Sequence, residues 1–163
     1  MWTRATSHGA GRKSGVRPMQ GMLAPEHTAR EVFDWLLPLY EDLADHVPDG
    51  ELIVMGDSAG GNPALSQVVQ AAANGAPRPA GSVLLPPCLD ASLSDPAITA
   101  LDRIDPIVSA HGVAELARMY AGPLDTHDPV VSPLFAALNG LPPIALITGT
   151  HEIATFVANV GVR

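Results

Sequence analysis

Residues 52–61 read LIVMGDSAGG: four apolar residues run into a Gly-x-Ser-x-Gly pentapeptide with Ser58 at its centre. The apolar run predicts a buried strand over residues 51–56, because both of its faces are apolar. Apolar side chains then recur at helical spacing, which predicts a helix over residues 63–73. We therefore expect a strand, a sharp turn that carries Ser58, and a helix.

This order of elements is the setting in which the pentapeptide forms a nucleophile elbow, with the serine hydroxyl pushed out at the edge of the sheet. We expect a Cβ at Gly56 or Gly60 to collide with the neighbouring strand or helix, and Ser58 to be held strained. The pentapeptide also occurs in glycine-rich turns, so the flanking strand and helix carry the argument. Pro63 removes a backbone donor early in the helix and would loosen the elbow.

The remaining apolar patterns extend this unit in both directions along the chain. They predict helices over 29–46, kinked at Pro38, and 109–121, and buried strands over 81–86 and 143–148. The segment that follows the strand over 81–86 is expected to be a loop as far as about residue 106. Residues 125–133 are expected to form a second loop. Strands that alternate with helices predict an α/β fold with a parallel sheet.

The 163-residue length fits one domain, residues 23–163, behind an irregular basic tail over residues 1–22. The net charge of −8 consists of +4 in the tail and −12 in the rest, which argues against a nucleic-acid partner. The single cysteine, Cys88, excludes an internal disulfide and fits a reducing compartment. No apolar run has the length of a membrane span or the core of a signal peptide, so we expect a cytoplasmic protein. No histidine pair has ligand spacing with a carboxylate, and we expect neither a metal nor a cofactor.

Several further segments lie before and after the serine motif in a fixed order along the chain. They are Leu23–His27 (LAPEH), 84–90 (LLPPCLD), Asp105-Pro106, 128–134 (DPVVSPL), and 140–143 (GLPP) leading to 149–153 (GTHEI). In order and spacing this set resembles the hormone-sensitive-lipase-like branch of the α/β-hydrolase-fold esterases, over residues 23–153.

The resemblance implies a parallel sheet with helices on both faces and hydrolysis of small carboxylic esters. Ser58 would be the nucleophile that forms an acyl-enzyme. The backbone N–H of Ala59 would stabilise the oxyanion. Glu152, after the third strand, would be the acid that orients a catalytic histidine.

Two parts of the family pattern are not in place. His8-Gly9-Ala10-Gly11 resembles the family's His-Gly-Gly-Gly oxyanion loop, but only eleven residues separate it from Leu23. A helix and a strand should intervene there, and they need roughly 25 residues. The catalytic histidine should follow the acid by about one helix and one strand, whereas Arg163 ends the sequence. His151 is the one candidate by position, with a surface histidine as the alternative, so the catalytic histidine stays unknown.

These departures predict a partial α/β-hydrolase fold that lacks the N-terminal strands and the C-terminal strand with its histidine. They also suggest a truncated or frame-shifted product. Three functions stay open: an ester hydrolase through Ser58, a catalytically inactive remnant or interaction fragment, and a peptidase or thioesterase with the same elbow. We expect very weak or no activity from the chain alone. Uncovered strands predict homo-oligomers that form through exposed sheet edges.

Overall fold

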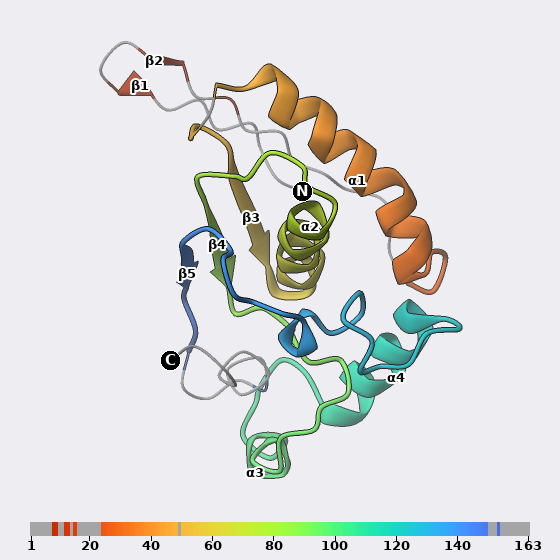
Figure 1. Ribbon diagram of the computed structural model, residues 1–163. Coiled ribbons are helices and arrows are strands. Elements are labelled where there is room, and N and C mark those ends of the chain that lie inside the picture. Colours follow the sequence, from red (N-terminus) through yellow and green to blue (C-terminus); the bar gives the residue numbers. More distant parts are fainter. Residues whose placement is uncertain are drawn as a thin grey trace.

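Three parallel strands and the helices between them form the body of the molecule in this computed structural model (Figure 1). The structure describes residues 8–9, 12–13, 15, 24–48, 50–149 and 153. The helices are α1 (Ala29–His46), α2 (Gly61–Ala73), α3 (Ile98–Leu101) and α4 (Ala110–Ala121), and the 3-10 turns are η1 (Ser58–Gly60) and η2 (Pro133–Phe135). The strands are β1 (His8–Gly9), β2 (Arg12–Lys13), β3 (Ile53–Asp57), β4 (Gly81–Leu85) and β5 (Ile144–Leu146).

The main sheet has the strand order β3-β4-β5, and all of its pairings are parallel. Gly56 lies opposite Leu84, which in turn lies opposite Leu146. The ladder runs on beyond β5, where the N–H of Ile147 donates to the carbonyl of Leu84 at 2.9 Å. The α/β class and the parallel sheet predicted from the sequence are thereby confirmed, and all three carboxyl ends point to the same edge.

Helix α2 covers one face of this sheet. Its Ala64 and Leu65 are buried against Leu84 and Leu89, and Val54 and Leu146 pack partly buried on the same cluster. The side chains on this face alternate with those on the other, as strand geometry requires. The sheet therefore has one well-packed face, and the nucleophile candidate stands at the start of the helix that packs on it.

The opposite face of the sheet is uncovered in the part of the chain that the structure describes. Ile53 is 48% exposed, Met55 63% and Ile147 56%. The prediction of buried strands over 51–56 and 143–148 is therefore wrong for this face. An apolar pattern shows that a face can be buried, but not that a second layer covers it.

Helix α1 packs behind α2, and its bounds agree with the prediction. Its first turn is closed by Glu31, whose carboxylate accepts hydrogen bonds from the N–H (2.8 Å) and the hydroxyl (3.0 Å) of Thr28. This is the reciprocal half of a capping box. Near the other end, Tyr40 donates its hydroxyl hydrogen to the carbonyl of Pro77 at 2.7 Å, which ties α1 to the loop behind α2. Pro38 lies inside the helix.

Short elements occur where the sequence predicts loops. Helix α3 interrupts one expected loop, and turn η2 starts at the last residue of the other; each is too short to show a full apolar period. Helix α4 starts one residue later than predicted, because Ser109 is its N-cap and accepts the N–H of Gly112 at 3.1 Å. Within the expected irregular tail, β1 pairs with β2 in antiparallel fashion. None of the described helices is long and apolar enough to cross a membrane.

Candidate active site

Ser58 lies where β3 ends and η1 begins, directly before α2. Its φ of 54° falls in the left-handed region, which among the described non-glycine residues only Leu93 shares. Such a conformation costs on the order of 1–3 kcal/mol and persists only where the surroundings hold it. The side chain is exposed, as a nucleophile that meets substrate would have to be.

Two glycines make the tight turn around Ser58 possible. A Cβ at Gly56 would lie 2.3 Å from the carbonyl oxygen of Gly60 and 2.7 Å from the Cβ of Ala64. A Cβ at Gly61 would lie 2.3 Å from the Cβ of Pro87. The expected collision is therefore present at Gly56.

The collision that we expected at Gly60 is absent, so that prediction is wrong. A Cβ there would meet nothing within 4 Å, and its φ of −73° is open to any residue. The crowded position is Gly61, because α2 passes against the loop that follows β4. The second glycine of the pentapeptide is therefore not required for space, whereas the residue after it is.

The loop after β4 is hydrogen-bonded to the serine turn and to the helix that follows it. The N–H of Cys88 donates to the carbonyl of Ser58 at 3.3 Å. Asn62, on the first turn of α2, donates from Nδ2 to the carbonyls of Cys88 (2.8 Å) and Val131 (2.7 Å). Asn62 is only 5% exposed, so its side chain makes these bonds shielded from water. One side chain thus clamps the helix that starts at the elbow to two loops.

Ala59 is the middle residue of η1, and it is exposed. The 3-10 turn leads straight into α2, so the Ala59 amide stands at the amino end of a helical stretch. Amides there lack partners within the helix and favour negative charge. The position suits an oxyanion donor.

A buried carboxylate, Asp90, organises the same loop. It is 2% exposed and accepts four hydrogen bonds, from the N–H and the hydroxyl of both Ser92 and Ser94. Burial acts to raise its pKa, but these four donors outweigh burial and hold the pKa below its usual value. Cys88, two residues before Asp90 in the loop, has its pKa raised to about 11 by burial and by the charge of Asp90. The cysteine is therefore a neutral packing group and not a nucleophile.

Glu152 and His151 lie outside the described residues, and so do Ala10 and Gly11 of the candidate oxyanion loop. Ile153, directly after Glu152, is described and is 1% exposed. Its N–H donates to Asp105 Oδ2 at 2.9 Å.

Three of the described histidines have a partner within their own segment of the chain. His46 bonds the Asp42 carbonyl at the end of α1, His111 lies 3.8 Å from Glu115, and His127 lies 3.0 Å from Asp125. No hydrogen bond joins a histidine to Ser58 among the described residues. In the same part of the chain, no three metal-ligating side chains cluster.

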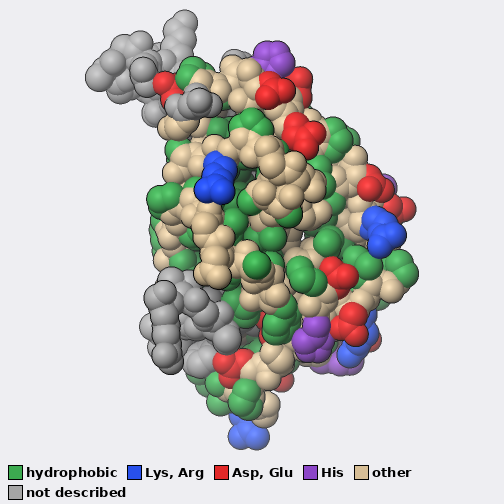
Figure 2. All heavy atoms as spheres, viewed as in Figure 1, with side chains coloured by type: hydrophobic (Ala, Val, Ile, Leu, Met, Phe, Trp, Pro, Cys, Tyr) green, Lys and Arg blue, Asp and Glu red, His purple; other side chains and the backbone are tan. Residues whose placement is uncertain are grey.

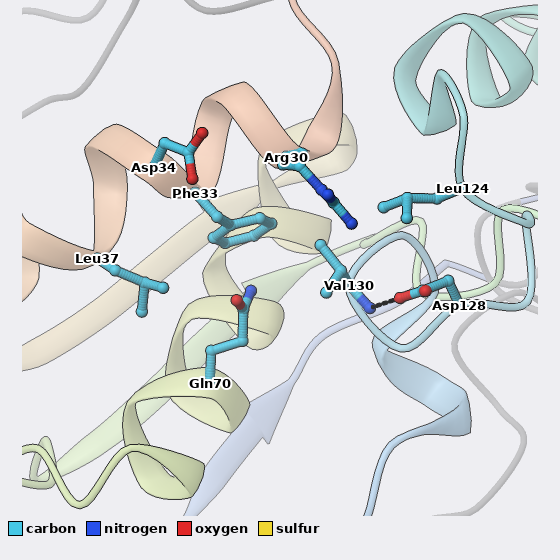
Figure 3. Close-up of a pocket in the computed structure, with 8 residues that line it drawn as sticks. All are labelled: Arg30, Phe33, Asp34, Leu37, Gln70, Leu124, Asp128 and Val130. Atoms are coloured by element: carbon cyan, nitrogen blue, oxygen red, sulfur yellow. Dashed lines mark hydrogen bonds between the residues drawn. The ribbon is translucent and has the colours of Figure 1, made fainter.

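Two hollows of the described surface are lined by residues other than those of the serine turn. The first, about 180 Å³, lies between α1, α2 and the loop before η2 (Figure 3). It is lined by Arg30, Phe33, Asp34, Leu37, Gln70, Leu124, Asp128 and Val130. The second, about 430 Å³, lies beside the far end of α2. Neither is lined by a residue of the serine turn.

Sequence reasoning did not find the roles of Asn62, Asp90 and Asp105. The spacing Asp90-x-Ser92-x-Ser94 was a local signal, since aspartate and serine side chains bond backbone groups two residues on. Asn62 and Asp105 act on residues 26 to 69 positions away. Spacing along the chain carries no sign of such bonds.

Comparison with known proteins agrees with this geometry. The family model of the α/β-hydrolase fold matches residues 21–155. An esterase of Acinetobacter venetianus is 32% identical over 133 residues, which are 80% of this chain and 44% of that esterase. An acetyl-hydrolase of Streptomyces hygroscopicus is 27% identical over 106 residues, which are 65% of this chain and 36% of that protein.

Solved structures agree as well. The crystal structure of a hormone-sensitive lipase from a metagenome library matches with a TM-score of 0.77 at 31% identity, over 83% of this chain and 47% of the lipase. The chain belongs to the α/β-hydrolase fold family and, within it, to the hormone-sensitive-lipase-like esterases, which are carboxylic-ester hydrolases. It spans less than half the length of these relatives.

Proposed function

We propose that this chain acts on carboxylic esters through Ser58. The observation that carries the proposal is the positive φ of Ser58 at a strand-to-helix turn, where Gly56 and Gly61 leave no room for a side chain. A strained serine at such a turn is the mark of a nucleophile elbow. Relatives named esterase and acetyl-hydrolase support small acyl esters as the substrate class.

In the proposed reaction, Ser58 Oγ forms a bond to the ester carbonyl carbon while its proton passes to a base. The carbonyl oxygen takes the negative charge and is stabilised by the Ala59 N–H. The bond to the alcohol oxygen then breaks, and the alcohol leaves with the proton. Water attacks the acyl-enzyme in the same way and releases the acid. Glu152 would orient the base, and no histidine is assigned to that role.

The second candidate is a catalytically inactive remnant that serves as an interaction fragment. It is favoured by His46, His111 and His127, each of which has its partner within its own segment of the chain and not in Ser58. Without a base, a serine hydroxyl is a poor nucleophile at neutral pH.

A fluorophosphonate label separates the two candidates, because labelling needs an activated serine. We expect the purified chain to be labelled slowly at Ser58 and to hydrolyse a short-chain chromogenic ester at most weakly. Ser58→Ala should abolish both, whereas Ser109→Ala, at an exposed serine that caps α4, should change neither. Equal background signals from the unsubstituted chain and from Ser58→Ala would establish the inactive fragment instead.

We also propose that two copies of the chain associate through the edge of the sheet at β3. Strand β3 has a neighbour on one side only among the described strands, and its uncovered face carries exposed Ile53 and Met55. Unpaired edges and contiguous apolar surface both favour association.

A further inference from the structure

Asp105 connects two parts of the chain that lie 48 residues apart. Its Oδ1 accepts the N–H groups of Ile107 (2.8 Å) and Val108 (3.1 Å), which closes a local turn after α3. Its Oδ2 takes no part in that turn and accepts the N–H of Ile153 at 2.9 Å. One oxygen of the carboxylate thus makes the two local bonds, and the other makes the long-range bond.

Asp105 is itself held in place and ionised. Its own N–H donates to the carbonyl of Leu101 at 2.8 Å, at the end of α3. Burial opposes ionisation, but the three backbone donors Ile153, Ile107 and Val108 outweigh burial and lower its pKa. A charged acceptor makes a stronger hydrogen bond to an N–H than a neutral one does.

The residue that Asp105 holds is also fixed by packing. Ile153 is buried in a cluster with Ile98 and Leu101 of α3, and Cys88 packs against that cluster. Cys88 in turn donates its N–H to the carbonyl of Ser58. A continuous set of contacts therefore runs from the serine turn, through Cys88, to Ile153.

Glu152, the expected acid, is bonded directly to Ile153 in the chain. We propose that Asp105 is a positioning residue of the active site: by its bond to the Ile153 N–H it holds Ile153, the chain neighbour of the proposed acid, in place relative to Ser58. This inference rests on the proposed function of Ser58 and Glu152.

Asp105→Asn is a selective test, because asparagine has one acceptor oxygen where aspartate has two. Asparagine suits the local turn, so the bonds to Ile107 and Val108 are kept and the bond to Ile153 is lost. Asp125→Asn is the matched control. Asp125 also accepts the N–H two residues on, that of His127 at 2.8 Å, and no bond of Asp125 to a distant segment is found among the described residues.

Two measurements on the purified chain are needed. Amide hydrogen exchange should be about tenfold faster at Ile153 in Asp105→Asn and unchanged at Ile107. The maximal rate of fluorophosphonate labelling at Ser58 should fall about 10- to 100-fold with the half-saturating concentration unchanged, since small misplacements of catalytic groups cost rate. Asp125→Asn should match the unsubstituted chain in both.

The failures are distinguishable. No labelling of the unsubstituted chain overturns the proposed function and, with it, the role of Asp105. Normal labelling of Asp105→Asn, beside a labelled unsubstituted chain, overturns the role of Asp105 alone. Unchanged exchange at Ile153 overturns the bond on which the role depends, and a raised half-saturating concentration at unchanged maximal rate assigns Asp105 to binding.

Discussion

At the scale of single residues, the serine turn depends on which positions lack a side chain. Gly56 and Gly61 each face another segment at a distance that no Cβ could accept, whereas Gly60 faces open space. Ser58, between them, carries the strained φ. The glycines therefore allow a close approach of strand, helix and loop, and that approach in turn holds the serine in its conformation.

Gly56→Ala and Gly60→Ala test this division. Gly56→Ala should lower the free energy of unfolding by about 3 kcal/mol, the upper end of overpacking costs, because the new methyl group meets backbone. Gly60→Ala should change it by less than about 1 kcal/mol, in the stabilising direction, because alanine reduces the entropy of the unfolded chain. Urea unfolding of both variants measures the difference. Equal losses of unfolding free energy in the two variants would show that crowding is not the reason why position 56 needs a glycine.

At the scale of elements, the loop after β4 is a structural part of the site. Asp90 closes it through Ser92 and Ser94, and the N–H of Ala91 donates to the Ser132 hydroxyl at 2.7 Å, which connects it to the loop before β5. The same loop touches the Ser58 carbonyl through Cys88. The conformation of the loop is thus coupled to the serine turn.

The charge of Asp90 makes this loop sensitive to acid. A carboxylate whose native pKa is lowered stabilises the fold above its unfolded pKa, about 3.9, and this contribution is lost as the pH falls through the native pKa. Asp90→Asn cannot be protonated, so its urea midpoint should fall less steeply than that of the unsubstituted chain between about pH 5 and pH 2.

The matched control for this experiment is Asp34→Asn, at an exposed carboxylate on α1. It should keep the pH slope of the unsubstituted chain. Parallel curves for Asp90→Asn and the unsubstituted chain would place the acid sensitivity in other carboxylates.

At the scale of the whole molecule, charge and apolar surface are unevenly distributed. Figure 2 shows acidic side chains gathered over α1 and on the side where α4 lies, with few basic ones in view. The net charge of −8 agrees with this. The sheet, in contrast, presents Ile53, Met55 and Ile147 on its uncovered face.

Replacing Ile53 and Met55 by lysine should weaken association of the chain. Charges on an edge strand block pairing with another copy, and both side chains are already exposed, so the fold should lose little. Light scattering after size-exclusion chromatography should show a shift toward monomer. Ile104→Lys, at an isoleucine that is 54% exposed outside the sheet, is the control and should leave the mass unchanged. The same mass for all variants would rule out the β3 edge as the interface.

Local pattern was enough to predict the helix over 29–46, the strand, turn and helix around Ser58, and the parallel order of the sheet. These depend on the spacing of apolar residues within one element and on the order of elements, both of which can be read along the chain. The motif set that resembles the esterases predicted the family, which the comparisons confirm. The roles of Ser58, Ala59 and Glu152 stay predictions.

Only the tertiary structure decided which glycine is crowded, which face of β3 is covered and which carboxylate holds Ile153. Gly61 meets Pro87, and Asp105 meets Ile153, because separate segments of the chain come together. Such contacts are set by the packing of whole elements and leave no periodic trace in the sequence. The sequence thus determined the turn that carries Ser58, and the packing of distant segments decided what surrounds and supports that turn.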